Sequence, residues 1–569
     1  MKKTVLIRIL SVLITGLFAA QAAQAQAPAW QMAMGTGAIR SEVRATTSDA
    51  SGNIYISGTY YGSATFGNIT LTGNGISSAY LFVAKWSTVS NSFVWAQKAG
   101  GTGYAEVNTI AVNGNSVYIA GRFGGTVQFG NTDLVNPNRN TTWQGADAFI
   151  AKLTDTGTAA QFEWAQYAGG PSEDVATALA VRGTDVYMAG YYSSDYQGTT
   201  PILFGGITLG KRGRRNIFLT KLTDAGSTCS FAWAQRAGGY DTDVASALAV
   251  SGTSIYMAGT LTSTEVDFGN QNVAVPSRSM FITKFTDTGS GGNFGWVQQA
   301  KGFVRASAMT VVGANVYVVG QFSGTANFDN LSMTSRASGS PSITTSDVFV
   351  TKLTDTGSSA GFIWAKQAGS SSDDEATRVV VAGSNVYVGG TFDAYGSTAS
   401  FGSTVLTSAG GTDLFVAKLI DSGSSADYSW AQRGGGVGDD SLLGLALVGT
   451  NVYAAGAIYD RATFGSQTVI SPAIGLVGYL AALQDNTITA TAPATARPEL
   501  SLWPNPARTS VRVPEATAAT TLTLLDATGR TVRTASGTVL PVQGVAPGLY
   551  VLQATTPGQP LRTARLVVE

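Results

Sequence analysis

The chain of 569 residues contains no histidine and a single cysteine, Cys229. The absence of histidine excludes serine–histidine triads, histidine general bases and histidine-ligated zinc or haem. A lone cysteine can form no internal disulfide, and in the stretch STCSFAW it is predicted to be a small, partly buried residue without a redox role. Histidine-based chemistry and disulfide stapling are therefore both excluded.

Charged residues are also scarce. They make up 12% of the chain, against about 25% in typical soluble domains. Lys and Arg number 35 and balance 35 Asp and Glu. The chain therefore has neither the basic surface expected for nucleic-acid binding nor an acidic tail. A hydrophobic content of 44% with 69 glycines favours many short strands joined by tight turns.

Long hydrophobic runs are lacking after the first twenty residues. No later stretch reaches the roughly 18–20 apolar residues that a membrane span needs. The start, MKKTVLIRILSVLITGLFAAQAAQAQ, has basic residues, then an apolar stretch, then small residues at Ala23 and Ala25. This order is typical of a secretory signal peptide over residues 1–25, cleaved between Ala25 and Gln26. We therefore expect an exported protein whose mature form has no transmembrane segment.

The chain does contain one long sequence motif that recurs along its length. FEWAQYAGGPSEDVATALAVRGTDVYMAG, starting at Phe162, returns at Phe231 as FAWAQRAGGYDTDVASALAVSGTSIYMAG. An apolar-Tyr-x-x-Gly motif, a Phe-Gly pair and a Phe-x-x-Lys strand recur with it, although the last lysine strand has changed to GYLAALQ. The tryptophans that anchor the copies are Trp30, Trp95, Trp164, Trp233, Trp296, Trp364 and Trp430. These markers predict seven copies of one structural repeat.

Each copy is predicted to form β-strands. TALAV and DVYMAG are short, alternating and separated by the polar turn RGT, AFIAKLT and FEWAQYA supply two more strands, and ILFGGITL is an extra hairpin. Four antiparallel strands in each of seven copies predict an all-β fold, a seven-bladed β-propeller over residues 26–485. The array starts with a lone fourth strand around Trp30 and ends after a third strand. The N-terminal strand is therefore expected to complete the last blade and close the ring, in preference to an open solenoid.

The repeat resembles a known family. DAFIAKLT, WAQYAGG and DVYMAG are similar to the bacterial β-propeller repeats often called SBBP-type, which are common in exported proteins. The resemblance covers roughly residues 29–485. It implies an architecture and no activity, because no catalytic residues are attached to the repeat itself.

A Thr/Ala/Pro-rich linker over 486–499 precedes a C-terminal module over 500–569. The segments SVRV, TLTLLD, TVRTA, LYVLQAT and TARLVVE predict a small β-sandwich. WPNPA, DATGR, GLYVL and the closing RLVVE resemble the type A C-terminal sorting domain of the type IX secretion system. The residues that carry this sorting signal are Trp503, Pro504, Asn505, Pro506, Gly529, Arg530, Gly548 and Tyr550.

The second resemblance implies a location. Proteins with such a domain belong to Bacteroidota-type cells, reach the periplasm by a signal peptide and cross the outer membrane through the type IX machinery, the partner of the domain. In that family the tail is removed and the protein is anchored to surface lipopolysaccharide or released. The expected location is therefore the outer-membrane surface or the medium.

One polar feature recurs within the repeat, an acid after the Trp-Ala-Gln-x-x-Gly-Gly phrase. One interpretation is a ring of carboxylates near the channel mouth that faces a polar ligand or a cation, for which Ca²⁺ would suit all-oxygen ligands. The other, favoured by an acid in nearly every copy, is that each Asp fixes its own turn by accepting backbone N–H bonds. The acids are Glu42, Glu106, Asp174, Asp243, Asp374 and Asp440. No catalytic residue, firm metal site or required cofactor is predicted.

These patterns leave three classes of function open. The first is a non-enzymatic surface or secreted propeller that binds a glycan or a surface protein. The second is a carbohydrate-active hydrolase or lyase using Asp and Glu, which would need unlike acids to meet where the repeat symmetry breaks. The breaks at KGFVRAS and at GKRGRR, the latter expected as a solvated hairpin tip, supply no such pair. The third is a purely structural envelope component. A binding protein rather than an enzyme is therefore predicted.

Overall fold

The computed structural model describes residues 26–75, 78–136, 145–193, 201–269, 271–275, 278–336, 345–393, 398–487, 502–514, 516–526, 530–556 and 562–569. Every named element in these ranges is a β-strand, as the all-β expectation requires. No helix in the described ranges is long and apolar enough to span a membrane. The expected signal peptide and most of the linker lie outside these residues. The chain divides into two compact units, Met1–Ile488 and Thr489–Glu569.

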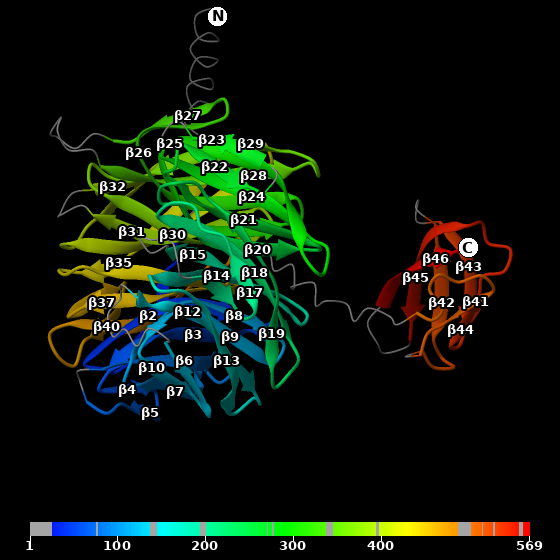
Figure 1. Cartoon of the computed structure of the whole chain (residues 1–569), viewed down its shortest axis with the longest axis horizontal. Coiled ribbons are helices and arrows are strands. Elements are labelled where there is room, and N and C mark those ends of the chain that lie inside the picture. The colour runs from blue at the N-terminus through cyan, green and yellow to red at the C-terminus, as the bar shows by residue number, and fades with distance from the viewer. Residues whose placement is uncertain are drawn as a thin grey trace, which may run out of the picture. The chain divides into compact units, whose positions relative to one another are not determined.

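The first unit repeats a four-stranded antiparallel sheet, called a module below (Figure 1). In module 3, β14 (Asp174–Arg182), β15 (Asp185–Ser193), β18 (Arg215–Asp224) and β19 (Cys229–Ala237) pair in that order. β14 contains TALAV and β15 contains DVYMAG, so these strand predictions are confirmed. The expected extra hairpin is also present, as β16 (Ile202–Phe204) paired with β17 (Ile207–Leu209).

The other modules follow the same order from inner to outer strand. Module 1 is β2 (Arg40–Ser48), β3 (Asn53–Tyr61), β6 (Ala79–Ser87) and β7 (Ser92–Gly101), and module 2 is β8 (Tyr104–Asn113), β9 (Ser116–Gly124), β12 (Asp147–Asp155) and β13 (Ala160–Gly169). Module 4 is β20 (Val244–Ser251), β21 (Ser254–Leu261), β24 (Ser279–Asp287) and the first half of β25 (Gly292–Val312). Module 5 is the second half of β25 with β26 (Asn315–Phe328), β28 (Ser346–Asp355) and β29 (Ala360–Ala368). Module 6 is β30 (Asp374–Ala382), β31 (Asn385–Asp393), β34 (Thr412–Asp421) and β35 (Ala426–Gly436).

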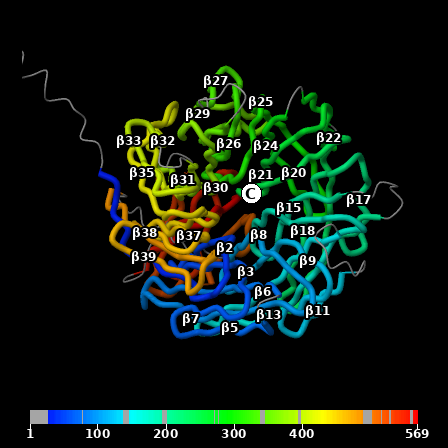
Figure 2. Tube along the Cα trace, turned by 90° about the vertical axis from the view of Figure 1, so that its left-hand side faces the viewer, coloured from blue at the N-terminus to red at the C-terminus, as the bar shows by residue number. Residues whose placement is uncertain are grey.

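Module 7 combines both ends of the unit. β36 (Ser441–Val448), β37 (Asn451–Tyr459) and β40 (Leu476–Gln484) come from its end, and β1 (Trp30–Gly35) from its start. β1 pairs antiparallel with β40, with Ala33 opposite Ala481. The inner strands β2, β8, β14, β20, β25, β30 and β36 contact one another in sequence, and β36 also contacts β2. Figure 2 shows the modules arranged radially around the inner strands.

Short hairpins follow the second strand of the modules. Besides β16 and β17 they are β4 (Ser63–Phe66) with β5 (Ile69–Thr72), β10 (Thr126–Phe129) with β11 (Thr132–Val135), β22 (Glu265–Phe268) with β23 (Gln271–Ala274), the end of β26 with β27 (Leu331–Thr334), β32 (Thr398–Phe401) with β33 (Thr404–Thr407), and β38 (Arg461–Phe464) with β39 (Gln467–Ile470). Their Phe-Gly phenylalanines pack on the modules. Phe204, for example, lies 4.9 Å from Phe218 between ring centroids.

The recurring Tyr-x-x-Gly motif has a backbone cause. The inner strand of each module has a bulge, which in β14 shifts the register between Ala176 and Ala178. A Cβ on Gly190 in β15 would collide with the carbonyl oxygen of Val175 beside this bulge. The same collision with the inner strand occurs at Gly58, Gly121, Gly259, Gly320, Gly390 and Gly456. Glycine recurs because a backbone carbonyl occupies the place of its side chain.

The hydrophobic core lies between adjacent modules. One cluster joins Leu219 and Trp233 of module 3 to Ile255, Met257 and Phe281 of module 4, all of them buried. Each sheet thus packs on its neighbours with both faces, which explains why its middle strands, such as β15 and β18, are buried along almost their whole length. A module on its own would leave one such face in water.

The C-terminal unit contains two sheets over one core. β41 (Ser510–Arg512) pairs with β44 (Val539–Pro541), and β43 (Thr531–Ser536), β42 (Thr521–Leu525), β45 (Gly548–Thr555) and β46 (Arg562–Val568) form the second sheet. Val511 and Leu540 of the first sheet are buried with Leu524, Leu552 and Leu566 of the second. All five strands expected from sequence are present. β44 was not expected, because it has three residues and one is proline.

Candidate functional site

The six recurring acids divide into two sets that differ by one residue in register. The carbonyls that approach the second-strand glycines belong to Glu42, Glu106 and Val175 among others, so both glutamates align with Val175 and not with Asp174. Successive side chains of a strand point to opposite faces, so a shift of one residue reverses the direction of the side chain. The buried set is Asp174, Asp243, Asp374 and Asp440. The structure therefore does not bring all six acids into one ring.

Each buried aspartate holds its own turn. The carboxylate of Asp174 accepts the backbone N–H of Gly170 at 2.6 Å and that of Ser193 at 3.1 Å. Asp440 likewise accepts the N–H groups of Gly436 at 2.6 Å and Tyr459 at 2.9 Å. These bonds tie the turn before the inner strand to the end of the second strand. This is the geometry of the turn-fixing interpretation.

Some of these aspartates face a second carboxylate. A Cβ on Gly369 would contact Asp374 and Asp347, and one on Gly435 would contact Asp413 and Asp440. Burial raises the pKa of Asp374 to about 8, with a further rise from the charge of Asp347. Burial similarly raises the pKa of Asp440 to about 7. Among the described residues, no group of three or more acidic, cysteine or histidine side chains is placed to hold a metal ion.

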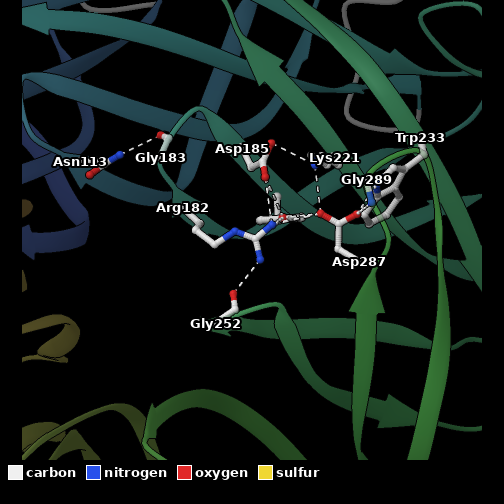
Figure 3. A network of polar contacts seen from close by, with 10 residues as sticks. Asn113, Arg182, Gly183, Asp185, Lys221, Trp233, Gly252, Asp287 and Gly289 are labelled. Atoms are coloured by element: carbon white, nitrogen blue, oxygen red, sulfur yellow. Dashed lines mark hydrogen bonds and ion pairs between the residues drawn. The ribbon is translucent and has the colours of Figure 1, made fainter. Parts of the chain in front are cut away.

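The acid that the sequence reasoning did not single out is the one in the DTG turn. Asp287, at the end of β24, accepts the Tyr187 hydroxyl at 2.6 Å, the Lys221 ammonium at 3.0 Å and the Trp233 indole N–H at 3.2 Å (Figure 3). It also accepts the backbone N–H of Gly289 at 2.9 Å. The three side-chain donors belong to module 3 and the acid to module 4. We call this cluster the latch, because it joins neighbouring modules through the Tyr, Lys and Trp markers of the repeat.

The latch recurs between modules. A tyrosine and a lysine of the preceding module bind Asp155, Asp224, Asp287, Asp355, Asp421 and Asp485. Between modules 7 and 1 the register places Ala482 at the lysine position and Thr88 at the acid position. The lysine missing from GYLAALQ is therefore matched by a missing acid. Neither charge is left unpaired in the interface.

The half-buried glutamates Glu42 and Glu106 belong to a chain of alternating charges near the start of the inner strands. Arg44 contacts Glu42 at 2.9 Å and also Glu106, and Arg122 contacts Glu106 at 2.6 Å. The chain continues from Arg122 to Glu173 at 2.6 Å and from there to Arg215 at 2.5 Å. We call Glu42, Arg44, Glu106, Arg122, Glu173 and Arg215 the charged ladder. It runs over modules 1 to 3 only, so it breaks the symmetry of the repeat.

Beside the ladder lies a cavity of about 280 Å³, the junction cleft, where modules 1, 2 and 7 meet. The guanidinium carbon of Arg40 lies 4.7 Å from the ring centroid of Tyr61. Among the described residues Arg40 forms no ion pair with a carboxylate. The residues that define the cleft are Arg40, Glu42, Arg44, Tyr61, Glu106 and Leu476. It combines an available cation, an aromatic ring and paired carboxylates.

The basic insert GKRGRR is not a hairpin tip. It leads from β17 into β18 and packs on aromatic rings, with the Arg212 guanidinium 4.7 Å from the ring of Tyr240 and that of Arg215 4.7 Å from Tyr191. Arg215 is also the last member of the ladder. The insert therefore packs on the protein surface through the contacts of these two arginines with Tyr240 and Tyr191.

Sequence reasoning singled out Arg215, as part of GKRGRR, but missed Arg40 and the ladder arginines Arg44 and Arg122. The sequence does contain a signal for these residues. It is found by aligning the inner strands of the modules on the second-strand glycines opposite their bulges and comparing the residue at each position. At the position of Arg40 the other modules carry unlike residues, such as Tyr104, Glu173 and Phe303. The repeats therefore diverge at this end of the inner strands, while the Tyr–Lys–Asp core of the latch recurs at six module interfaces.

In the C-terminal unit, the residues of the expected sorting signal connect the two ends of the fold. Asn505 donates its side-chain N–H to the carbonyl of Arg565 at 2.8 Å and accepts the Val567 N–H at 3.0 Å, which ties WPNPA, with Pro504 and Pro506, to RLVVE. Tyr550 donates its hydroxyl to the carbonyl of Ala546 at 2.7 Å.

The remaining sorting residues lie at the surface or in the sheet. Trp503 is 73% exposed, Arg530 contacts Asp526 at 3.1 Å, and Gly548 pairs with Val568. Gly529 lies outside the described residues, as does Ala25 of the expected cleavage site, while Gln26 is the first described residue.

No protein-family model matches the sequence, and no curated protein matches it. Among solved structures, the chain is similar to a protein of unknown function from Dyadobacter fermentans, with 9% identity and a TM-score of 0.35 over 80% of this chain and 98% of that one. It is also similar to the extracellular domains 1–2 of Drosophila Semaphorin 1b, with 7% identity and a TM-score of 0.37 over 80% and 87%. A third match is a Trypanosoma rangeli sialidase in complex with sialic acid, with 9% identity and a TM-score of 0.31 over 84% and 85%. These low scores identify no function for this chain.

Proposed function

We propose that the chain is an exported, closed seven-bladed β-propeller that binds a polar ligand, a glycan or a surface protein, in the junction cleft. Closure is supported by the pairing of β1 with β40 and by the contact of β36 with β2. The cleft depends on closure, because Leu476 of module 7 and Arg40 of module 1 both line it. The observation that carries the proposal is this cleft, the place where charged and aromatic side chains break the repeat.

The side chains of the cleft suit recognition of a polar ligand. Arg40 stacks on Tyr61 and keeps its N–H donors available, and the ring offers an apolar face of the kind that packs on sugars and on aromatic side chains. The ladder holds the neighbouring arginines and glutamates in fixed positions by mutual ion pairs. A preorganised set of donors and acceptors binds without first having to order its own side chains.

The pairing of the carboxylates favours binding over hydrolysis. Both carboxylate oxygens of Glu106 are already engaged by guanidinium N–H groups, one by Arg44 and one by Arg122. A glycosidase needs one carboxyl group that is protonated and able to donate to the leaving group. Asp374 and Asp440, two of the acids whose pKa is raised, are buried in turns. This arrangement supports a non-enzymatic function.

The test uses the chain from Gln26 to Glu569 on immobilised polysaccharides and envelope extracts, with and without Ca²⁺, and scores both retention and soluble product. We expect retention without product, and a loss of at least about tenfold in affinity for Arg40→Ala, which removes the cation of the cleft. Arg278→Ala, at an exposed position outside the cleft, is the matched control. Release of product would overturn the proposal in favour of an enzyme. No retention on any material would favour a structural envelope component.

We further propose that residues 500–569 direct the protein to the type IX machinery, which leaves it attached to the outer-membrane surface or released. The resemblance of WPNPA, DATGR, GLYVL and RLVVE to that sorting domain supports this, as does the compact separate unit that contains them. Deleting Leu500–Glu569 should leave the protein in the periplasm, measured by fractionation and by antibody access to intact cells. Unchanged surface display of the deletion would contradict this role.

A further inference from the structure

One inner-strand residue breaks the symmetry at the centre of the modules. The position directly after the inner-strand bulge is Ala45, Thr109, Ala178, Ala247, Ala308 and Gly444 in six modules. In module 6 it is Arg378, on β30. A long cation therefore stands where the rest of the ring carries small residues.

Arg378 crosses from module 6 to module 1. Its guanidinium donates to the carbonyl of Thr377 at 2.7 Å and to the carbonyl of Arg44 on β2 at 3.1 Å. The intervening strand β36 contributes Gly444, where a Cβ would collide with Thr46.

The charge of Arg378 has no carboxylate partner. In the described part of the chain no Asp or Glu oxygen lies within ion-pair distance of its guanidinium, whereas the ladder arginines each contact at least one. Removal from bulk water lowers the pKa of Arg378 to about 10, with a smaller contribution from Arg44 and an opposing one from Glu375. The group remains a cation at neutral pH. The side chain of Arg378 is half-buried, and a partly desolvated cation without a counter-charge is unfavourable unless something else compensates it.

The guanidinium lines a central cavity of about 140 Å³, bordered by β2, β8, β14, β20, β25 and β30. This volume is far above the roughly 10–15 Å³ that holds one water molecule. The hydroxyl oxygen of Thr46, which also lines the cavity, is buried without a hydrogen-bond partner. The hydroxyl of Ser246 already donates to the carbonyl of Ala306 at 2.6 Å. The strongest donor left for a guest is therefore Arg378, with Thr46 beside it.

We propose that the central cavity binds a small free oxyanion, such as phosphate or sulfate, through the guanidinium of Arg378. Arginine is suited to such anions because its planar fork donates two parallel N–H bonds to two oxygens. The small side chains of the other modules leave room for the anion without competing for the charge. The site is distinct from the junction cleft and does not depend on what that cleft binds.

The experiment titrates the chain from Gln26 to Glu569 with sodium phosphate and with sodium sulfate by calorimetry, at an ionic strength held constant with sodium chloride. We expect saturable binding of one anion per chain, and at least about tenfold weaker binding by Arg378→Ala. This variant installs the residue that modules 1, 3, 4 and 5 already carry at that position. The surface variant Arg278→Ala should bind like the wild type.

A second variant keeps the proposal testable should Arg378→Ala fail to fold. Arg378→Lys retains the charge but loses the fork, and we expect at least about threefold weaker binding. Absence of saturable binding by the wild type below about 50 mM of either anion, far weaker than charge-assisted bidentate pairing predicts, would overturn the proposal. Equal anion affinity of the wild type and either Arg378 variant would also overturn the proposal. Arg378 would then only donate hydrogen bonds to the carbonyls of Thr377 and Arg44.

Discussion

At the scale of residues, the same residue type does two different jobs in this repeat. The latch aspartates meet a lysine and a tyrosine of the neighbouring module, and the turn aspartates meet backbone N–H groups and sometimes a second acid. Although burial raises its pKa, the hydrogen bonds from Tyr187 and Gly289 and the charge of Lys221 lower the pKa of Asp287 to about 2. Environment rather than residue type therefore decides the charge of each carboxylate.

Removing a latch acid should destabilise the protein strongly. Asp421→Ala leaves the ammonium of Lys352, which is 7% exposed, without its carboxylate partner, and breaking a buried pair in this way costs about 3–5 kcal/mol. The measurement is chemical denaturation. Asp427→Ala removes an ion pair with Lys366 whose acid is 82% exposed, and should cost less than about 1 kcal/mol. Equal losses in the two variants would show that the latch is not stabilising.

The stability that the buried turn aspartates contribute should decrease as the pH rises. Asp374 has a folded pKa of about 8 against about 3.9 in an unfolded chain, so the folded state binds more protons between these values. Its contribution to stability is present in full below about pH 4 and is lost as the pH rises towards 8. Relative to Asp374→Asn, the wild type should lose up to about 1.4 kcal/mol per pH unit between about pH 5 and 7. Parallel stability profiles of the two proteins would contradict this.

The residue scale is also where the sequence was least informative. The repetition of Asp174 and its counterparts was visible, and so was the possibility that they hold turns. Glu42 and Glu106 were grouped with them by counting from the tryptophans, and a difference of one residue in that count reverses the face of a strand. The latch acid was overlooked because DTG is a common turn sequence and its partners come from the previous module.

At the scale of elements, period-two alternation and polar turns predicted the strands of modules such as β14 and β15 correctly. The bulge in the inner strand could not be predicted, because it adds one residue without changing the composition of the strand. The glycine opposite the bulge was visible as a motif. Its reason was not, since that depends on the carbonyl of another strand.

Substitution of a glycine opposite a bulge should destabilise the protein much more than substitution of a glycine in a hairpin turn. Gly190→Ala would place a Cβ on the carbonyl oxygen of Val175 and should cost about 2–4 kcal/mol, because backbone must shift in a closely packed sheet. Gly206→Ala, in the turn between β16 and β17, meets nothing within 4 Å and should change stability by less than about 0.5 kcal/mol. Thermal or urea denaturation measures both. If Gly190→Ala left the stability unchanged, the close approach at the bulge could not be the reason that glycine recurs in the motif.

At the scale of the whole molecule, the repeat count and the lone strand around Trp30 were sufficient to predict where the two ends of the first unit meet. The junction cleft could not be predicted in the same way, because it combines β2, β8 and β40, which are brought together only by the folded arrangement. The candidate site is therefore a consequence of how the two ends of the first unit are joined. The interface there also lacks the latch that joins the other modules.

The most direct test is a disulfide across the closing strand pair. With Cys229→Ser as background, Ala33→Cys and Ala481→Cys place two thiols on paired residues of β1 and β40, within the range that a disulfide spans. Ala151→Cys with Ala165→Cys, paired within module 2, is the control. A closed ring predicts that both pairs oxidise within one chain, seen as a mobility shift on a non-reducing gel that reduction reverses. An oxidised control beside free thiols at positions 33 and 481 would contradict closure, and with it the junction cleft.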